Sequence, residues 1–138
     1  MTILVGYTPS PEGMAAVDFG IEQARAFDEA LLVLNAGIGE AHEEKGIATA
    51  EDLKELGDKL QAAGIRQELK QFLRGNDPVE EILALAEATP EVRMIVIGSR
   101  ERSLVGKLIM GSTAQRIILG AEVPVVSVKA KKSRVKKS

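Results

Sequence analysis

Apolar residues follow two spacings that alternate along this chain. Short apolar runs with the length and composition of buried strands occupy residues 2–7, 31–34, 92–97 and 123–128. Between them, apolar residues recur every three or four positions, which is typical of an amphipathic helix with one buried face. These helical stretches cover residues 11–28, 53–63, 78–89 and 112–120. Residues 65–73 place Ile65, Leu69 and Leu73 on one face, which predicts a further strand at the edge of a sheet.

Local signals predict where two of the helices begin. Ser10 is placed to cap the first helix, with Pro11 as its first residue. Asp77 is placed in the same way before Pro78, and Glu80 is expected to complete a capping box with it. The polar and proline-containing segments therefore read as turns between strands and helices.

Strict alternation of strand and helix predicts an α/β fold. Five strands joined through four helices require right-handed crossovers and a parallel sheet covered on both faces. We therefore expect a three-layer α/β/α sandwich with a five-stranded parallel sheet. Pro124 lacks an N–H donor and is expected at a strand start or at a sheet edge.

Composition excludes several classes of protein. The 138 residues fit one domain, and the absence of cysteine excludes disulfides, thiolate catalysis and zinc sites built on thiolates. No apolar run has the length of a membrane span and no secretory signal opens the chain, so we expect a cytoplasmic protein with no membrane partner. The chain has few aromatic residues on which bases could stack, and its net charge of −2 does not attract nucleic acid. We therefore expect no specific nucleic-acid binding.

The basic residues are distributed unevenly. Six of the 18 lie at the C-terminus without an accompanying acid, and they are Lys129, Lys131, Lys132, Arg134, Lys136 and Lys137. Such a run is typical of a solvated terminus. We expect a folded domain over residues 1–129 and a disordered basic tail over residues 130–138.

Small and polar residues gather where three of the predicted strands end. They are Thr8, Pro9 and Ser10 after the first strand, Asn35 and Ala36 after the second, and Gly98 and Arg100 after the strand at residues 92–97. In open parallel sheets, ligands bind beyond the carboxyl ends of the strands, where the strand order reverses. Glycine lets the backbone approach a phosphate, hydroxyls donate to it and arginine neutralises it. This pattern predicts a cleft suited to a nucleotide.

Gly111, Ser112 and Thr113 open the last predicted helix. The first turn of a helix has unpaired N–H groups and the positive end of the dipole, so these residues are candidates for holding a phosphate. Ser112 is equally placed to be an N-cap with Gln115 completing a capping box, which is the commoner role.

Other motifs that carry chemistry do not fit the chain. A P-loop needs Ser or Thr after Gly106-Lys107, where the chain has Leu108. A dinucleotide fingerprint starting at Gly37 needs glycine at position 42, where the only histidine stands. That lone histidine cannot form a metal-binding pair, and no Gly-x-Ser-x-Gly elbow is present.

Several segments together resemble the universal stress protein family over nearly the whole chain before the tail. They are Ile3-Leu4-Val5-Gly6, Ser10-Pro11-Glu12, Gly75-Asn76-Asp77-Pro78, Val96-Ile97-Gly98-Ser99-Arg100, and Gly111-Ser112 through Val123-Pro124-Val125. The family's nucleotide-binding members carry Gly-x2-Gly-x9-Gly-Ser/Thr, and this chain matches it at Gly98 and Gly111-Ser112 but has Glu101 as the middle residue. Thr8 stands where binding members usually have an acidic residue.

The resemblance implies the remaining expectations about architecture and role. It implies the adenine-nucleotide alpha hydrolase-like fold, with strand order 3-2-1-4-5 and a reversal between strands one and four. It also implies a homodimer that pairs through the last strand, which begins at Val123 and ends at Val128. Proteins similar to this chain are generally regulators or binders rather than dedicated enzymes.

Three hypotheses about function follow. The first is a dimeric stress-response regulator that binds ATP, AMP or cAMP, with Mg²⁺ only if ATP is bound. Its site residues would be Thr8, Pro9, Ser10, Ala36, Gly98, Arg100, Gly111, Ser112 and Thr113. The second is a nucleotide-independent dimer that acts through protein partners, which Glu101 and Thr8 favour. The third is slow nucleotide hydrolysis, for which the sequence offers no general base.

Overall fold

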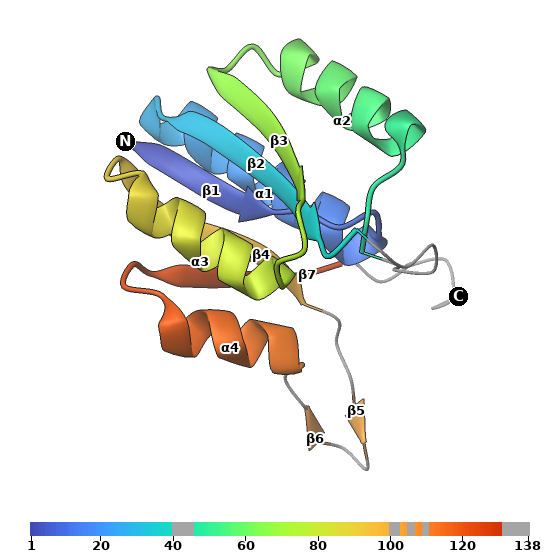
Figure 1. The fold of residues 1–138 in the computed structure, drawn as a ribbon. Helices are drawn as coiled ribbons and strands as arrows, with labels where there is room; N and C mark the ends of the chain where they lie inside the picture. Colours follow the sequence, from blue (N-terminus) through green and yellow to red (C-terminus); the bar gives the residue numbers. More distant parts are fainter. Residues whose placement is uncertain (40–45, 100–102, 105–106, 109–110, 131–138) are drawn as a thin grey trace, which may run out of the picture.

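The computed structural model describes residues 1–39, 46–99, 103–104, 107–108 and 111–130 (Figure 1). Its larger elements, in chain order, are β1 (Thr2–Gly6), α1 (Pro11–Phe27), β2 (Ala30–Gly37), α2 (Ala50–Ala62), β3 (Gln67–Leu73), α3 (Pro78–Ala88), β4 (Val92–Ser99), α4 (Ser112–Gly120) and β7 (Val125–Lys129). Two short strands, β5 (Ser103–Leu104) and β6 (Lys107–Leu108), pair antiparallel between β4 and α4. The basic tail over residues 131–138 lies outside the described residues.

The central sheet is five-stranded, with the order β3-β2-β1-β4-β7 and parallel pairing at every junction. Helices α1 and α2 cover one face, and α3 and α4 cover the other (Figure 1). The predicted three-layer sandwich and the strand order are therefore confirmed. The reversal of strand order lies between β1 and β4, because β2 and β3 extend to one side and β7 to the other.

Alternate side chains of the strands build two aliphatic cores. In β1, Ile3 and Val5 pack toward α1 and α2, while Leu4 packs toward α3 and α4. All three side chains are fully buried, each contributing about 1.5–3 kcal/mol of hydrophobic free energy relative to exposure. Since both faces of the sheet are covered, its central strands are continuously apolar, as the sequence predicted.

Several elements depart from their predicted bounds. β2 runs on to Gly37 instead of ending at residue 34, so Asn35 and Ala36 lie within the strand, and α2 begins at Ala50 instead of residue 53. Residue 65 lies before β3, and Leu73 at the end of that strand is 44% exposed rather than inward-facing. β7 starts at Val125, after Pro124, whose carbonyl accepts a hydrogen bond from the Ile95 N–H. The hairpin of β5 and β6 was not predicted, because two-residue strands leave no periodic pattern.

Two of the predicted helix caps form, and two capping boxes do not. Ser10 Oγ accepts from the Gly13 N–H at 3.0 Å, and Asp77 Oδ1 accepts from the Val79 N–H at 2.7 Å. Asp77 thus caps α3 directly, but among the described residues the Asp77 N–H does not donate to the Glu80 carboxylate, as the predicted capping box requires. The prediction that Ser112 caps α4 with Gln115 is wrong, because Gly111 is the N-cap and no described side chain caps α4.

Candidate functional site

A crevice between diverging connections is expected at the carboxyl end of the sheet. β1 and β4 are neighbours, with Gly6 opposite Ile97. The chain leaves β1 for α1 on one face, whereas it leaves β4 for α4 on the opposite face (Figure 1). Diverging connections of this kind leave the space in which open α/β sheets bind ligands.

Close backbone packing accounts for two glycines at this edge. A Cβ on Gly98 would lie 2.2 Å from the Glu12 carbonyl oxygen, and a Cβ on Gly13 would lie 1.9 Å from the Thr8 carbonyl oxygen. The end of β4, the first turn of α1 and the segment after β1 are thus in direct backbone contact. Gly98 is required for this packing whether or not a ligand is bound nearby.

The segment after β1 presents two linked hydroxyls. Thr8 Oγ1 and Ser10 Oγ lie 2.9 Å apart, and Ser10 Oγ also accepts from the Gly13 N–H. Ser10 is therefore engaged as a helix cap, while Thr8 is exposed and Pro9 is half-buried between them. Of these three residues, Thr8 has the side chain most open to a ligand.

The two residues predicted near the end of β2 play different parts. Ala36 is 6% exposed and packs in the core on the α3 face, so its side chain is not open to solvent. Asn35 is fully buried, and its amide bonds to Tyr7, Gly46, Ala48 and Gln71. This network was missed because the pattern of the sequence does not reveal that residues 46–48 return to the end of β2.

Tyr7, whose carbonyl takes part in that network, has a buried ring in the core on the α1 face. Burial raises the pKa of its phenol, and the nearby carboxylates of Asp52 and Glu55 raise it further. The phenol therefore stays protonated at neutral pH, and its role here is packing.

No described side chain caps the N-terminus of α4. Among the described residues, nothing lies within 4 Å of the place that a Cβ on Gly111 would occupy, and Ser112 and Thr113 are exposed. The first turn of α4 contains no acidic residue and has no cap from a described side chain, so no carboxylate of that turn neutralises its N–H groups. Such a helix end is suited to an anion.

An ion pair fixes the start of α4 against α3. Arg116 Nη1 donates to Asp77 Oδ2 at 2.9 Å. Partial burial works against the charge on Asp77, but the hydrogen bonds from Arg116 and from the Val79 N–H outweigh it and hold the pKa of this carboxyl below its ordinary value. Asp77 thereby caps α3 and also orients α4.

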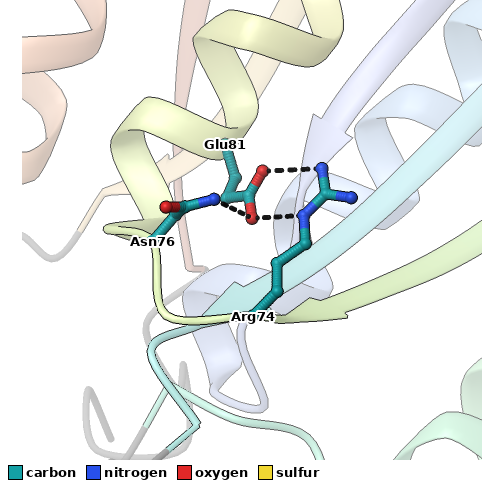
Figure 2. A network of polar contacts seen from close by, with 3 residues as sticks. All are labelled: Arg74, Asn76 and Glu81. Carbon is teal, nitrogen blue, oxygen red and sulfur yellow. Dashed lines mark hydrogen bonds and ion pairs between the residues drawn. The ribbon is translucent and has the colours of Figure 1, made fainter.

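Close to Asp77, a network of polar contacts around the Glu81 carboxylate lies at the start of α3 (Figure 2). Arg74 donates to both carboxylate oxygens of Glu81, at 2.8 and 3.0 Å, and Asn76 donates to the same group at 3.2 Å. The Arg74 guanidinium also lies over the Phe72 ring, 4.0 Å from its centroid. Glu81 is 3% exposed, and the Arg74 hydrogen bonds, aided by Asn76, hold its pKa below its ordinary value despite burial.

The Glu81 network makes a prediction about stability. Arg74→Met leaves the buried Glu81 carboxylate with only Asn76 as a side-chain donor among the described residues, and a buried group that loses its partner costs about 1–3 kcal/mol at pH 7. The pKa of Glu81 lies below its ordinary value of 4.5, so the stabilisation is present above that pH and is lost as the pH falls through the lowered pKa. Urea unfolding at pH 7 and pH 3 measures both effects.

The control for this prediction is the exposed neighbour Glu80. Glu80→Gln should leave the unfolding free energy within about 0.5 kcal/mol of the parent at both pH values. Glu81→Gln should instead lower stability at pH 7 and shrink the difference between the two pH values. Equal pH dependence in Glu81→Gln and Glu80→Gln would contradict the assignment.

A groove of about 880 Å³ lies elsewhere, along α1. Its lining includes Met14, Phe19, Ala62 and Val128, together with the ion pair between Asp18 and Lys59 at 2.7 Å. Its charges have both signs and do not define a class of ligand. Among the residues with described positions, no cluster of three or more His, Asp or Glu side chains is arranged to hold a metal ion.

Comparison with known proteins then identifies the family. Residues 1–129 match the profile of Usp, the universal stress protein family. A universal stress protein of Mycolicibacterium smegmatis is 41% identical over 127 residues, covering 92% of this chain and 96% of that protein. The chain belongs to the universal stress protein family. The resemblance noted in the sequence is thus confirmed.

Two solved universal stress proteins from Archaeoglobus fulgidus share the fold. One is 31% identical, with a TM-score of 0.78, and the match covers 94% of this chain and 98% of the other. The second, solved in complex with dAMP, is 26% identical with a TM-score of 0.62 and the same coverage. The fold is therefore the adenine-nucleotide alpha hydrolase-like fold expected of this family.

The family's glycine signature is only partly within the described structure of this universal stress protein. Gly98 and Gly111-Ser112 lie at the end of β4 and the start of α4. The expectations that fall on Arg100 and Glu101 lie outside the described residues. Of the helices in the described ranges, none combines the length and the apolar character that crossing a bilayer requires.

Proposed function

We propose that this universal stress protein binds an adenine nucleotide at the crevice between β1 and β4. The main support is the start of α4, which no described side chain caps and where Ser112 and Thr113 are exposed beside the open Gly111. N–H groups that no described side chain caps, together with exposed hydroxyls, suit a phosphate. The dAMP complex of the Archaeoglobus fulgidus relative supports an adenine nucleotide as the ligand class.

Each candidate residue within the described structure receives a role from its surroundings. Gly111, Ser112 and Thr113 would hold phosphates, and Gly98 would keep the end of β4 packed against α1 at the edge of the site. The role of Arg100, which lies outside the described residues, comes from the sequence alone: it would add positive charge. Thr8 contacts the nucleoside with its hydroxyl, while Pro9 and Ser10 shape that side of the site. Because the Ala36 side chain is buried, Ala36 would contribute only its backbone. Mg²⁺ is needed only if the bound nucleotide is ATP.

Thermal unfolding with added nucleotide tests this proposal. A ligand at about 100 times its Kd stabilises the folded state by roughly 2.7 kcal/mol. ATP with Mg²⁺, AMP and cAMP should therefore raise the melting temperature, and inosine monophosphate, which lacks the 6-amino group of adenine, should raise it less than AMP. An unchanged melting temperature with all three adenine nucleotides at millimolar concentration would refute the proposal.

The second candidate function is nucleotide-independent action through protein partners. Thr8 favours it, because a neutral hydroxyl already bonded to Ser10 binds a sugar hydroxyl less strongly than a carboxylate does. Glu101 in the middle of the glycine signature favours it as well. Under this alternative the protein purifies free of adenine and the melting temperature does not respond to nucleotides.

We also propose that the protein is a homodimer paired through β7. The two edge strands of the sheet, β3 and β7, differ in charge, and the less charged strand, β7, is the one suited to pairing with a second copy. β3 carries charge, including the Lys70–Glu68 ion pair at 3.1 Å, whereas β7 is Val-Val-Ser-Val before Lys129. An apolar edge strand such as β7 promotes aggregation unless it is paired. Charged side chains on β3 disfavour pairing at the other edge of the sheet. Leu119, near the end of α4, is 86% exposed and is a further uncovered apolar side chain.

The direction of the β7 backbone groups makes the dimer testable. The Pro124 carbonyl points toward β4, where it accepts from the Ile95 N–H. Since N–H and C=O of one residue point to the same side of a strand and alternate along it, the groups of Val125 and Ser127 point to the open edge. Ser127→Pro should therefore remove an outward donor while leaving pairing with β4 intact.

We expect Ser127→Pro to shift the protein from dimer to monomer with an unchanged circular dichroism spectrum. Light scattering during size-exclusion chromatography measures the mass. The control Glu122→Pro changes an exposed residue just before β7 and should leave a dimer. A dimeric Ser127→Pro variant would argue against pairing through this strand.

A further inference from the structure

A saturated amide network lies at the carboxyl ends of three neighbouring strands. Asn35, on β2, donates through Nδ2 to the carbonyls of Tyr7 and Gly46 at 2.9 and 2.8 Å. Its Oδ1 accepts from the Ala48 N–H and from Gln71 Nε2, both at 2.9 Å. All four hydrogen-bonding positions of the Asn35 amide are used. Since Asn35 is fully buried, each lost partner would leave a costly unsatisfied group.

Gln71, on the edge strand β3, and Asn35 together bind both backbone groups of Ala48, and we call this pair of hydrogen bonds the hold on Ala48. Gln71 Nε2 donates to the Ala48 carbonyl at 3.0 Å while it also donates to Asn35. The N–H and the C=O of Ala48 are therefore both bound by side chains of the sheet. Ala48 itself is 4% exposed and packs in the core on the α1 face. The backbone at this point is fixed by side chains from β2 and β3.

The segment held in this way lies beside Thr8. A Cβ on Gly46 would meet the Thr8 methyl group at 3.8 Å, which is an ordinary van der Waals distance, and no closer contact arises from the described residues. Immediately after Ala48, Thr49 caps α2 with a capping box to Asp52. Residues 46–49 thus form a short segment tied to the ends of β1, β2 and β3 and to the start of a helix.

We propose that Asn35 and Gln71 are positioning residues that hold Gly46 against Thr8 and so set the width of the nucleoside end of the crevice. The proposal rests on the proposed nucleotide site and adds Gly46 to it as a position that limits access to Thr8. A Cβ at Gly46 would lie beside the Thr8 methyl, and no described backbone from elsewhere in the chain comes within 4 Å of it, so a branched side chain would begin in the space beside Thr8. Gly46 would therefore control access to Thr8 rather than the stability of the fold.

Two variants and one control test the proposal in the full-length protein. Gln71→Met keeps the length of the side chain but removes both donors, and Gly46→Val narrows the space beside Thr8. Gln67→Met, on the same strand but exposed at its first residue, is the matched control for Gln71→Met. Hydrogen exchange of the Ala48 amide without nucleotide measures the hold, and calorimetric titration with AMP and with ATP measures binding.

Gln71→Met should speed exchange of the Ala48 amide and weaken AMP binding, each at least about tenfold, because one ordinary hydrogen bond is worth about that factor and the variant loses two. Gly46→Val should weaken AMP and ATP by the same factor, because both share the nucleoside and differ only in phosphates. It should leave the melting temperature of the free protein within about 2 °C of the parent. Gln67→Met should change none of these quantities.

The outcomes separate this proposal from the proposed function. Absence of AMP and ATP binding in the parent protein would overturn the nucleotide site and this inference together. Parent binding that persists unchanged in Gly46→Val and in a Gln71→Met variant with a faster-exchanging Ala48 would overturn the positioning role alone. Unchanged exchange of Ala48 in Gln71→Met would overturn the hold itself.

Discussion

Gly98→Ala is expected to destabilise the protein by about 3 kcal/mol or more, at the upper end of the cost of overpacking. A Cβ at this position would lie 2.2 Å from the Glu12 carbonyl oxygen and 2.5 Å from the Glu12 carbonyl carbon. Both atoms belong to the backbone in the first turn of α1, so no side-chain rotation relieves the clash. Either the end of β4 or the start of α1 must move.

Urea unfolding of Gly98→Ala beside Gly111→Ala checks this expectation. A Cβ on Gly111 would meet no described atom within 4 Å, and this N-cap has a negative φ, so alanine fits there. Loss of the glycine N-cap should cost only a few tenths of a kcal/mol to about 1 kcal/mol. Similar destabilisation by the two variants would mean that Gly98 does not pack closely against α1.

Gly111→Glu should abolish nucleotide binding while leaving the fold intact. The glutamate would place a carboxylate at the N-terminus of α4, where the exposed N–H groups and the hydroxyls of Ser112 and Thr113 are proposed to hold phosphate. A like charge close to a phosphate and competition for the same donors should weaken ATP at least about a hundredfold, roughly 2.7 kcal/mol. The same carboxylate interacts favourably with the helix dipole, so stability should not fall.

The comparison variant for this substitution is Glu122→Gln, which removes a charge at an exposed position at the opposite end of α4. It should bind ATP like the parent protein. Calorimetric titration measures the affinities and thermal unfolding measures the stability. ATP binding by Gly111→Glu at the parent affinity would place the phosphates elsewhere.

The contrast between Gly98 and Gly111 shows what the sequence could and could not reveal. Both glycines belong to one signature and received the same role from the sequence, because the signature records only their spacing. The structure separates them, since Gly98 packs against backbone and Gly111 has no described atom close to its Cβ position. Only the position of α1 relative to β4 reveals this difference, and that position depends on contacts between distant parts of the chain.

The five strands of the sheet and the four helices were predictable, because their signal is local, whereas β5 and β6 were not. The apolar runs and helical spacings reflect burial on a sheet face or a helix face, and Ser10 and Asp77 cap through bonds that span three residues or fewer. Strand order came from the family resemblance, because alternation predicts a parallel sheet but not which strands are neighbours. The N-cap of α4 was placed one residue too late, since Gly111 and Ser112 are both common N-caps.

The polar networks could not be predicted from the sequence. The sequence places Glu81 in a pair of acids typical of a solvated helix face, yet Glu81 is buried by Arg74 and Asn76 from the turn between β3 and α3. Asn35 has the sequence context of a turn residue, yet it joins segments 11 to 36 residues away. An asparagine at the end of an apolar run was the only signal in the sequence, and it becomes meaningful once its neighbours in space are known.

Calorimetric titration of AMP into nucleotide-free parent protein tests the nucleotide site most directly. We expect saturable binding with one nucleotide for each chain, the same stoichiometry with ATP, and no such binding in Gly111→Glu. The absence of heat from AMP, ATP and cAMP at millimolar concentration would contradict the site, provided that circular dichroism and mass spectrometry verify a folded, full-length chain.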